Sequence, residues 1–133
     1  MLASETLPTG RALLSGRRIL VVEDEYFLAD DISSMLRSLG ADVAGPTGDI
    51  NDALRILGDG SVIDGAVLDV NVHNDMVFPV AHELKARHVP FVFTTGYDKV
   101  TLGPEFEGVM HWEKPIDIAA MLRGLAGLME QPN

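Results

Sequence analysis

The chain has 133 residues, of which 47% are hydrophobic, and it contains no cysteine. This length suits one domain, and the apolar fraction is high enough for a buried core, which excludes a disordered chain. Ten Lys and Arg against twenty Asp and Glu give a net charge of -10, which argues against nucleic acid or an anionic membrane as partner. Without cysteine, disulfides, thiol catalysis and cysteine-based zinc sites are excluded.

The first segment of the chain, residues 1–16, lacks a sustained hydrophobic period and carries Pro8, Gly10 and Gly16. We interpret it as an N-terminal arm. The sequence has neither a signal-peptide core nor an apolar run of about 18 residues, the length that a membrane-spanning helix needs. A cytoplasmic protein is therefore expected.

Short apolar runs alternate with segments of helical spacing in the first half of the chain. Ile19 to Val22 predicts a buried strand, and the apolar residues between Leu28 and Leu39 have the spacing of a helix that Gly40 ends. A second strand is expected over 41–46. The apolar stripe over 50–57 predicts the second helix.

The second half continues this alternation. Strands are expected over 64–70, 89–96 and 108–113, and helices over 77–84 and 118–129. Between the last two strands, Gly103 and Pro104 weaken the helix that the pattern would place there. A strand followed by a helix, repeated five times, predicts an α/β fold with a parallel sheet and helices on both of its faces.

Polar residues stand where the predicted strands end. Right-handed crossovers bring the carboxyl ends of parallel strands to one edge of the sheet, where ligands bind in folds of this kind. We therefore expect these residues to lie together. They are Glu23 and Asp24 after the first strand, Asp69 in the third, Thr94 and Thr95 in the fourth, and Lys114 after the fifth.

This set of side chains predicts a particular chemistry. Three carboxylates in one place repel each other, and a divalent cation removes that penalty. All-oxygen ligands suit Mg²⁺, Mn²⁺ or Ca²⁺, and a site with few protein ligands and retained waters suits Mg²⁺ best. A lysine and a hydroxyl beside a cation can bind the oxygens of a phosphoryl group, and a carboxylate can be the nucleophile that receives it.

Four motifs, VVEDE, VLDVN, FVFTTGY and EKP, resemble the signature positions of two-component response-regulator receiver domains. Their order and spacing match the family over about residues 17 to 130, and we expect the receiver domain to span 17–131. The resemblance implies a doubly wound, five-stranded parallel sheet of the flavodoxin-like (CheY-like) type, with strand order 2-1-3-4-5. It also implies a phosphoacceptor that catalyses only its own phosphorylation and dephosphorylation, and so is not an enzyme in the usual sense.

The resemblance also implies roles for single residues. Asp69 is the implied phosphoacceptor, acting with Thr95 and Lys114. The implied metal ligands are Glu23, Asp24, Asp69 and the backbone carbonyl of Asn71. The implied switch residues are Thr95, Tyr97 and His111.

PFVFTTGY further resembles the FATGUY-type subfamily of single-domain receivers, with Thr94 where alanine is usual. The subfamily has a short or mobile fourth helix, which agrees with Gly103 and Pro104. The implied phosphodonor is a sensor histidine kinase or a histidine phosphotransfer protein. Because the chain ends at Asn133 with no room for an output domain, signalling to a downstream protein by direct contact is expected.

Two alternatives remain open at this point. A haloacid-dehalogenase-like phosphohydrolase uses similar residues, although its nucleophile follows the first strand and its acidic pair comes late in the chain. The other alternative is a receiver-like interaction module that is never phosphorylated. The complete set of five side chains argues against such a module.

Overall fold

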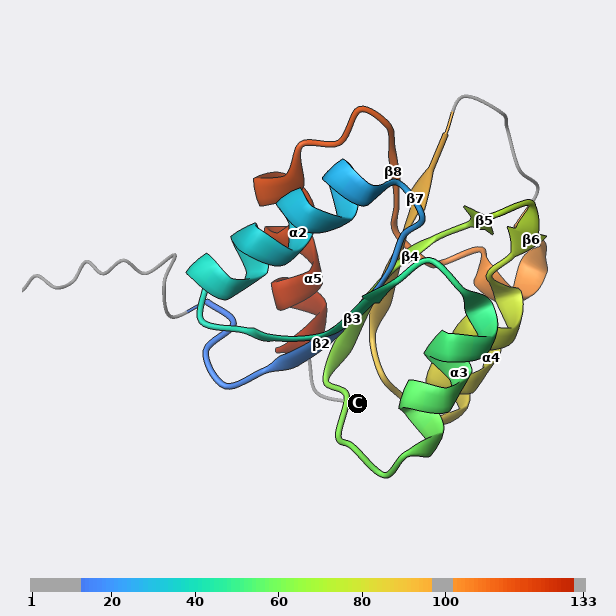
Figure 1. Cartoon of the computed structure of the whole chain (residues 1–133), viewed down its shortest axis with the longest axis horizontal. Helices are drawn as coiled ribbons and strands as arrows, with labels where there is room; N and C mark the ends of the chain where they lie inside the picture. Colours follow the sequence, from blue (N-terminus) through green and yellow to red (C-terminus); the bar gives the residue numbers. More distant parts are fainter. Residues whose placement is uncertain (1–12, 97–101, 131–133) are drawn as a thin grey trace, which may run out of the picture.

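The fold is known from a computed structural model that describes residues 13–96 and 102–130. Five parallel strands form its main sheet, in the spatial order β3-β2-β4-β7-β8 (Figure 1). In chain order this is 2-1-3-4-5, so the predicted fold class is confirmed. The strands are β2 (Arg18–Val22), β3 (Asp42–Thr47), β4 (Gly65–Asp69), β7 (Phe91–Thr95) and β8 (His111–Glu113).

Within the described residues, four α-helices cover the sheet, two on each face (Figure 1). On one face lie α2 (Tyr26–Ser38) and α5 (Ile118–Met129), and on the other lie α3 (Ile50–Gly58) and α4 (Phe78–Ala86). No helix among the described residues is long and apolar enough to cross a membrane.

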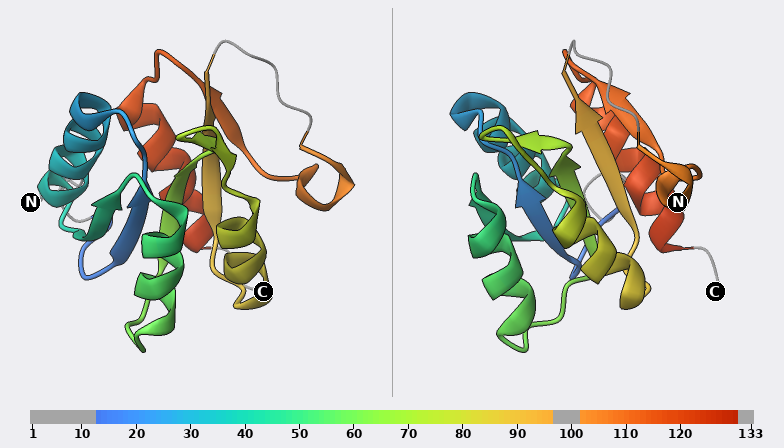
Figure 2. Two further views of the ribbon diagram at one scale, coloured as in Figure 1. Left: turned by 45° about the vertical axis from the view of Figure 1, so that its right-hand side comes forward. Right: turned by 90° about the vertical axis from the view of Figure 1, so that its right-hand side faces the viewer.

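Alternate residues of the central strands enter two separate cores. In β2, Ile19 and Val21 pack toward α2 and α5, whereas Leu20 and Val22 pack toward α3 and α4. A parallel strand that is buried on both faces needs apolar residues at every position, which explains the unbroken run in this part of the sequence. Because the strands are parallel, their carboxyl ends lie together at one edge of the sheet (Figure 2).

A small hairpin follows the central strand, and the sequence did not predict it. Its strands are β5 (Asn71–Val72) and β6 (Asp75–Met76), which pair antiparallel. The two turn residues, His73 and Asn74, have φ angles of 50° and 69°. Positive φ at both positions is the geometry of a type I′ turn, which matches the twist of a hairpin.

In place of a fourth helix, the described part of the segment before β8 contains one 3₁₀ turn, η1 (Pro104–Phe106). Phe106 is fully buried and its ring stacks on Phe78 at 5.3 Å between centroids. His82 of α4 also pairs with Glu105 at 3.1 Å. The expected short fourth helix is thus a turn anchored to α4, while residues 97–101 lie outside the described part.

The packed domain includes the end of the expected N-terminal arm. Leu14 is buried in the core beneath α2, and its amide donates to the Leu39 carbonyl at 3.1 Å. Residues 1–12 of the arm lie outside the described residues.

Candidate functional site

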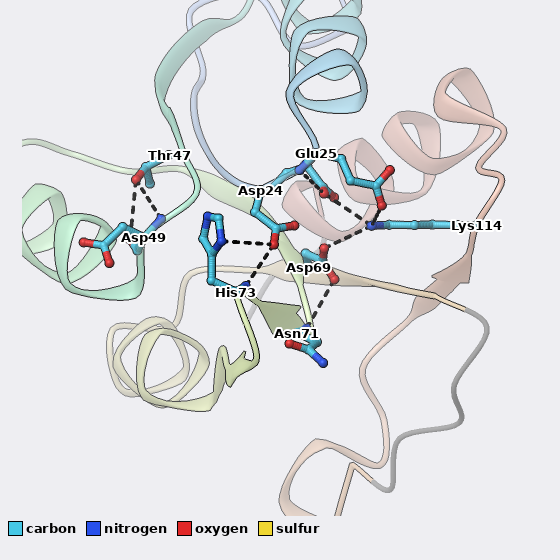
Figure 3. Close-up of polar contacts among 9 residues, drawn as sticks. Asp24, Glu25, Thr47, Asp49, Asp69, Asn71, His73 and Lys114 are labelled. Carbon is cyan, nitrogen blue, oxygen red and sulfur yellow. Dashed lines mark hydrogen bonds and ion pairs between the residues drawn. The ribbon is translucent and has the colours of Figure 1, made fainter.

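Asp69 is the last residue of the central strand β4 and is buried at the carboxyl edge of the sheet. The neighbouring strand β2 ends one residue before Glu23, which brings Glu23 and Asp24 to the same place. Carboxylate oxygens of Glu23, Asp24 and Asp69 lie within 4.8 Å of one another. The acidic cluster expected from the strand ends is therefore present, and Figure 3 shows Asp24 and Asp69 facing Lys114 and the hairpin.

Lys114 reaches this cluster from the end of β8. Its backbone amide donates to the Thr95 carbonyl at 2.8 Å, which fixes the residue next to β7. Its Nζ donates to Asp69 Oδ2 at 3.0 Å and to Glu23 Oε2 at 3.3 Å. The peptide bond from Lys114 to Pro115 is cis.

The shortest contact of the Lys114 ammonium is to Glu25, a residue that the sequence did not predict to lie in the site. Glu25 Oε2 lies 2.8 Å from Lys114 Nζ (Figure 3). The backbone amide of Glu25 also donates to Glu23 Oε2 at 2.9 Å. Glu25 is the last residue of the VVEDE motif and its third acidic residue. The presence of a third acidic residue there was the signal that could have predicted its place in the site.

Burial dominates the electrostatics of the two inner carboxyl groups. It raises the pKa of Glu23 to about 7, although the hydrogen bond from the Glu25 amide opposes the rise. Burial also raises the pKa of Asp69, and here the opposing influence is Lys114. Burial lowers the pKa of Lys114, but the hydrogen bonds to Glu25 and Asp69 outweigh this effect. The pKa of Lys114 is therefore raised. Ionised carboxylates are thus held here at a cost in free energy that a cation would reduce.

The residues present fit a hard divalent cation. Glu23 Oε1 is buried and has no hydrogen-bond partner within the described part of the chain. A buried oxygen left in this state is costly unless something binds it. Together with the two neighbouring carboxylates, it forms an all-oxygen donor set of the kind that Mg²⁺ or Mn²⁺ prefers.

The β5–β6 hairpin borders the acidic cluster. The His73 amide donates to Asp24 Oδ2 at 2.9 Å, and the Asn71 amide donates to Asp69 Oδ1 at 3.2 Å. A pocket of about 450 Å³ opens above Asp69, and its lining includes Asp24, Asn71, His73 and Lys114. The predicted ligand Asn71 therefore lies at the pocket with the acidic residues.

The three predicted switch residues are placed differently. Thr95 ends β7 at the same edge as Asp69 and is half-buried. His111 begins β8, where it is exposed and pairs in register with Phe93. Tyr97 lies outside the described residues. Thr94 is fully buried as the register partner of Asp69, and its hydroxyl has no partner among the residues that the structure describes.

Solved structures provide the comparison with known proteins. SdrG from Sphingomonas melonis Fr1 is 32% identical with a TM-score of 0.74, and the match covers 85% of this chain and 95% of SdrG. A response regulator receiver protein from Sinorhizobium medicae WSM419 is 25% identical with a TM-score of 0.69, covering 85% and 94%. The BeF3-activated conformation of SdrG, from Pseudomonas melonis Fr1, is 34% identical with a TM-score of 0.67, covering 84% and 95%. No protein-family model and no curated protein matches the sequence.

Proposed function

Since the chain belongs to the family of response-regulator receiver domains, we propose that it is a single-domain response regulator phosphorylated on Asp69. The observation that carries this proposal is the buried Asp69 carboxylate at the end of the central strand, 3.0 Å from Lys114 Nζ and beside two further carboxylates. The receiver domain over 17–131, membership of the FATGUY-type subfamily and a cytoplasmic location are parts of the same proposal. A haloacid-dehalogenase-like hydrolase is not supported, because Asp69 ends the third strand of the main sheet in chain order and not the first.

The proposed phosphodonor is the phosphohistidine of a sensor kinase or of a histidine phosphotransfer protein. An Asp69 carboxylate oxygen attacks phosphorus, the P–N bond breaks, and the leaving imidazole nitrogen keeps the electron pair and is protonated. Lys114 favours the ionised Asp69 that this attack requires, and its ammonium can then bind a phosphoryl oxygen. Later attack of water on phosphorus breaks the P–O bond to Asp69, which releases inorganic phosphate and restores the carboxylate.

A cation is part of this proposal. Glu23, Asp24, Asp69 and the backbone carbonyl of Asn71 would hold Mg²⁺, with Mn²⁺ as the alternative. When bound, the ion offsets the negative charge of the phosphoryl oxygens and of the carboxylates around them.

The switch residues would then report the phosphoryl group to a downstream protein. Thr95 ends the strand next to Asp69, so its hydroxyl can turn toward a phosphoryl oxygen. Tyr97 and His111 are proposed to repack when it does. Asn71 and Tyr97 are proposed to tune the lifetime of the phosphorylated state, as the resemblance to receiver domains implies.

Exposed apolar side chains beside the pocket offer a surface for the phosphodonor. Tyr26 and Phe27 follow Glu25 directly and are 75% and 80% exposed, with their rings edge to face at 5.5 Å. Next to them, a pocket of about 430 Å³ is lined by Leu28, Ile116 and other residues. Exposed aromatic residues are typical anchors of protein interfaces, and a donor bound here would have its histidine close to Asp69.

Phosphotransfer from radiolabelled kinases or phosphotransfer proteins tests the proposal. The wild type should take up the label in the presence of Mg²⁺, and the label should be labile to hydroxylamine, as an acyl phosphate is. Asp69→Asn keeps the shape of the side chain and should take up none. Asp75→Asn is the matched control, because Asp75 is an exposed residue of β6 outside the acidic cluster, and it should behave like the wild type. Normal labelling of Asp69→Asn would overturn the assignment.

A further inference from the structure

The ammonium of Lys114 is fully occupied in this structure. A lysine side chain has three N–H donors. Lys114 Nζ has three carboxylate acceptors, Glu25 at 2.8 Å, Asp69 at 3.0 Å and Glu23 at 3.3 Å. For Lys114 to bind a phosphoryl oxygen, it must therefore give up one of these contacts.

The three carboxylates differ in how easily they can be released. The Glu23 side chain is 1% exposed and the Asp69 side chain is 5% exposed, so neither could exchange Lys114 for water without rearrangement. The Glu25 side chain is 61% exposed. Its carboxylate can become hydrated when it leaves Lys114, which makes it the least costly of the three to displace.

The backbone position of Glu25 gives independent support. Glu25 is the N-cap residue of α2 with φ −83° and ψ 110°, and its side chain makes no capping hydrogen bond. The residues that ordinarily cap a helix with their side chains at this position are Asp, Asn, Ser and Thr, so the longer Glu25 side chain is not tied to the first helical turn. Here the carboxylate turns to Lys114 instead (Figure 3).

We propose that Glu25 is a placeholder, whose carboxylate occupies Lys114 in the unphosphorylated protein and must be displaced before Lys114 binds a phosphoryl oxygen. Glu25 thereby lowers the affinity of the site for tetrahedral phosphoryl-like anions. It acts through Lys114 and is a positioning residue. The inference rests on the proposed function, since it concerns the same lysine and the same phosphoryl group.

The test measures binding of beryllofluoride in the presence of saturating Mg²⁺, followed by the fluorescence of Trp112, the single tryptophan. Glu25→Gln should bind beryllofluoride about two- to fivefold more tightly than the wild type, because an exposed ion pair of this kind is worth up to about 1 kcal/mol. Asp31→Asn is the matched control. Asp31 lines the neighbouring pocket and is exposed, so the variant removes the same charge from the same face without a contact to Lys114.

A second measurement separates a contact from general electrostatics. The NMR shift of Lys114 Nζ should change in Glu25→Gln without ligand, and this difference from the wild type should vanish once beryllofluoride is saturating. It should not change in Asp31→Asn. Equal beryllofluoride affinity in the wild type and Glu25→Gln, or an equal gain in Asp31→Asn, would overturn the placeholder while leaving the phosphoacceptor proposal intact. A wild type that binds no beryllofluoride would overturn both.

Discussion

Gly48 lies so close to Asp24 that a Cβ atom at this glycine would stand 3.1 Å from the Asp24 Cα and 3.3 Å from its Cβ. The same atom would also lie 3.4 Å from Nε2 of His73, the residue whose amide donates to Asp24 Oδ2. Three loops thus meet around one carboxylate. The absence of a side chain at position 48 lets them do so.

We therefore expect Gly48→Ala to displace Asp24 and to weaken Mg²⁺ binding. Because the nearest atom belongs to the backbone, relief requires movement of the loop and not only of a flexible side chain. Calorimetric titration with Mg²⁺ should show a loss of affinity of about five- to a hundredfold, a cost of roughly 1–3 kcal/mol. Gly127→Ala in α5 is the control, since its Cβ would meet nothing within 4 Å. It should leave Mg²⁺ affinity unchanged and stabilise the fold by about 0.5–1 kcal/mol. A Mg²⁺ affinity of Gly48→Ala equal to that of the wild type would contradict the close packing of Gly48 against Asp24.

The pH dependence of Mg²⁺ binding should follow Glu23. Burial raises the pKa of this carboxyl from 4.5 to about 7, so below pH 7 the proton competes with the cation. Affinity should rise with pH, by at most about tenfold per unit below the pKa, and level off above it. Calorimetry on either side of pH 7 measures this. In Glu23→Gln, binding should be weaker and the dependence on pH should shrink to the part that the raised pKa of Asp69 causes.

The same shift predicts the stability of the protein without metal. Between pH 4.5 and about 7 the folded Glu23 holds a proton that the unfolded chain has released. Because the folded state binds more protons, the free energy of unfolding should fall as pH rises through this window. Urea unfolding in the presence of a chelator should show this loss, and a rise in stability over the same window would contradict the raised pKa of Glu23.

Asp69→Asn should raise stability in the absence of a cation, even though it removes a contact to Lys114. Burial raises the pKa of Asp69 in spite of the lysine, so the fold disfavours the ionised carboxylate on balance. An amide of the same shape carries no charge to desolvate and does not repel Glu23. We expect a gain of about 1 kcal/mol, or ~4 °C in the melting temperature, as is common when a functional residue is neutralised. Melting in the presence of a chelator is the measurement. A less stable variant would mean that the ion pair with Lys114 outweighs burial.

Thr94→Val should stabilise the protein without affecting phosphorylation. The Thr94 hydroxyl is fully buried and has no partner in the described part of the structure. Replacing an unsatisfied buried hydroxyl by a methyl group of similar shape removes a penalty of about 1–3 kcal/mol. Thr95→Val is the contrasting variant. It should change the free energy of unfolding little, but it should abolish the conformational change that the proposed phosphorylation of Asp69 triggers through Thr95. Destabilisation by Thr94→Val would show that the hydroxyl is satisfied after all, for example by a buried water.

The sheet and the acidic cluster could be predicted because both follow from periodic features of the chain. Strands buried on both faces need continuous apolar runs such as Ile19 to Val22, and the direction of the crossovers then puts Asp69 and Lys114 at one edge. The packing confirmed this part of the prediction, since each run lies in the expected strand.

Other contacts do not follow from periodicity. Glu25 is exposed, and the conformation of its side chain depends on where Lys114 lies, which only the folded structure determines. The β5–β6 hairpin has strands of two residues and a His-Asn turn in place of the usual Asn-Gly signal. The anchoring of Phe106 depends on ring contacts with residues far apart in the sequence, among them Phe78 and Phe91.

Leu14 has a practical consequence for anyone who shortens this protein. The leucine precedes the first strand, yet it seals the core at the end of α2 through its side chain and its amide. A chain trimmed to begin at Arg17 would lose the buried Leu14 side chain. Removing a buried leucine side chain typically lowers the free energy of unfolding by about 2–5 kcal/mol. A chain trimmed to begin at Leu13 would keep it. For protein engineering, the smallest unit that folds well therefore starts ahead of the motifs by which the domain is recognised.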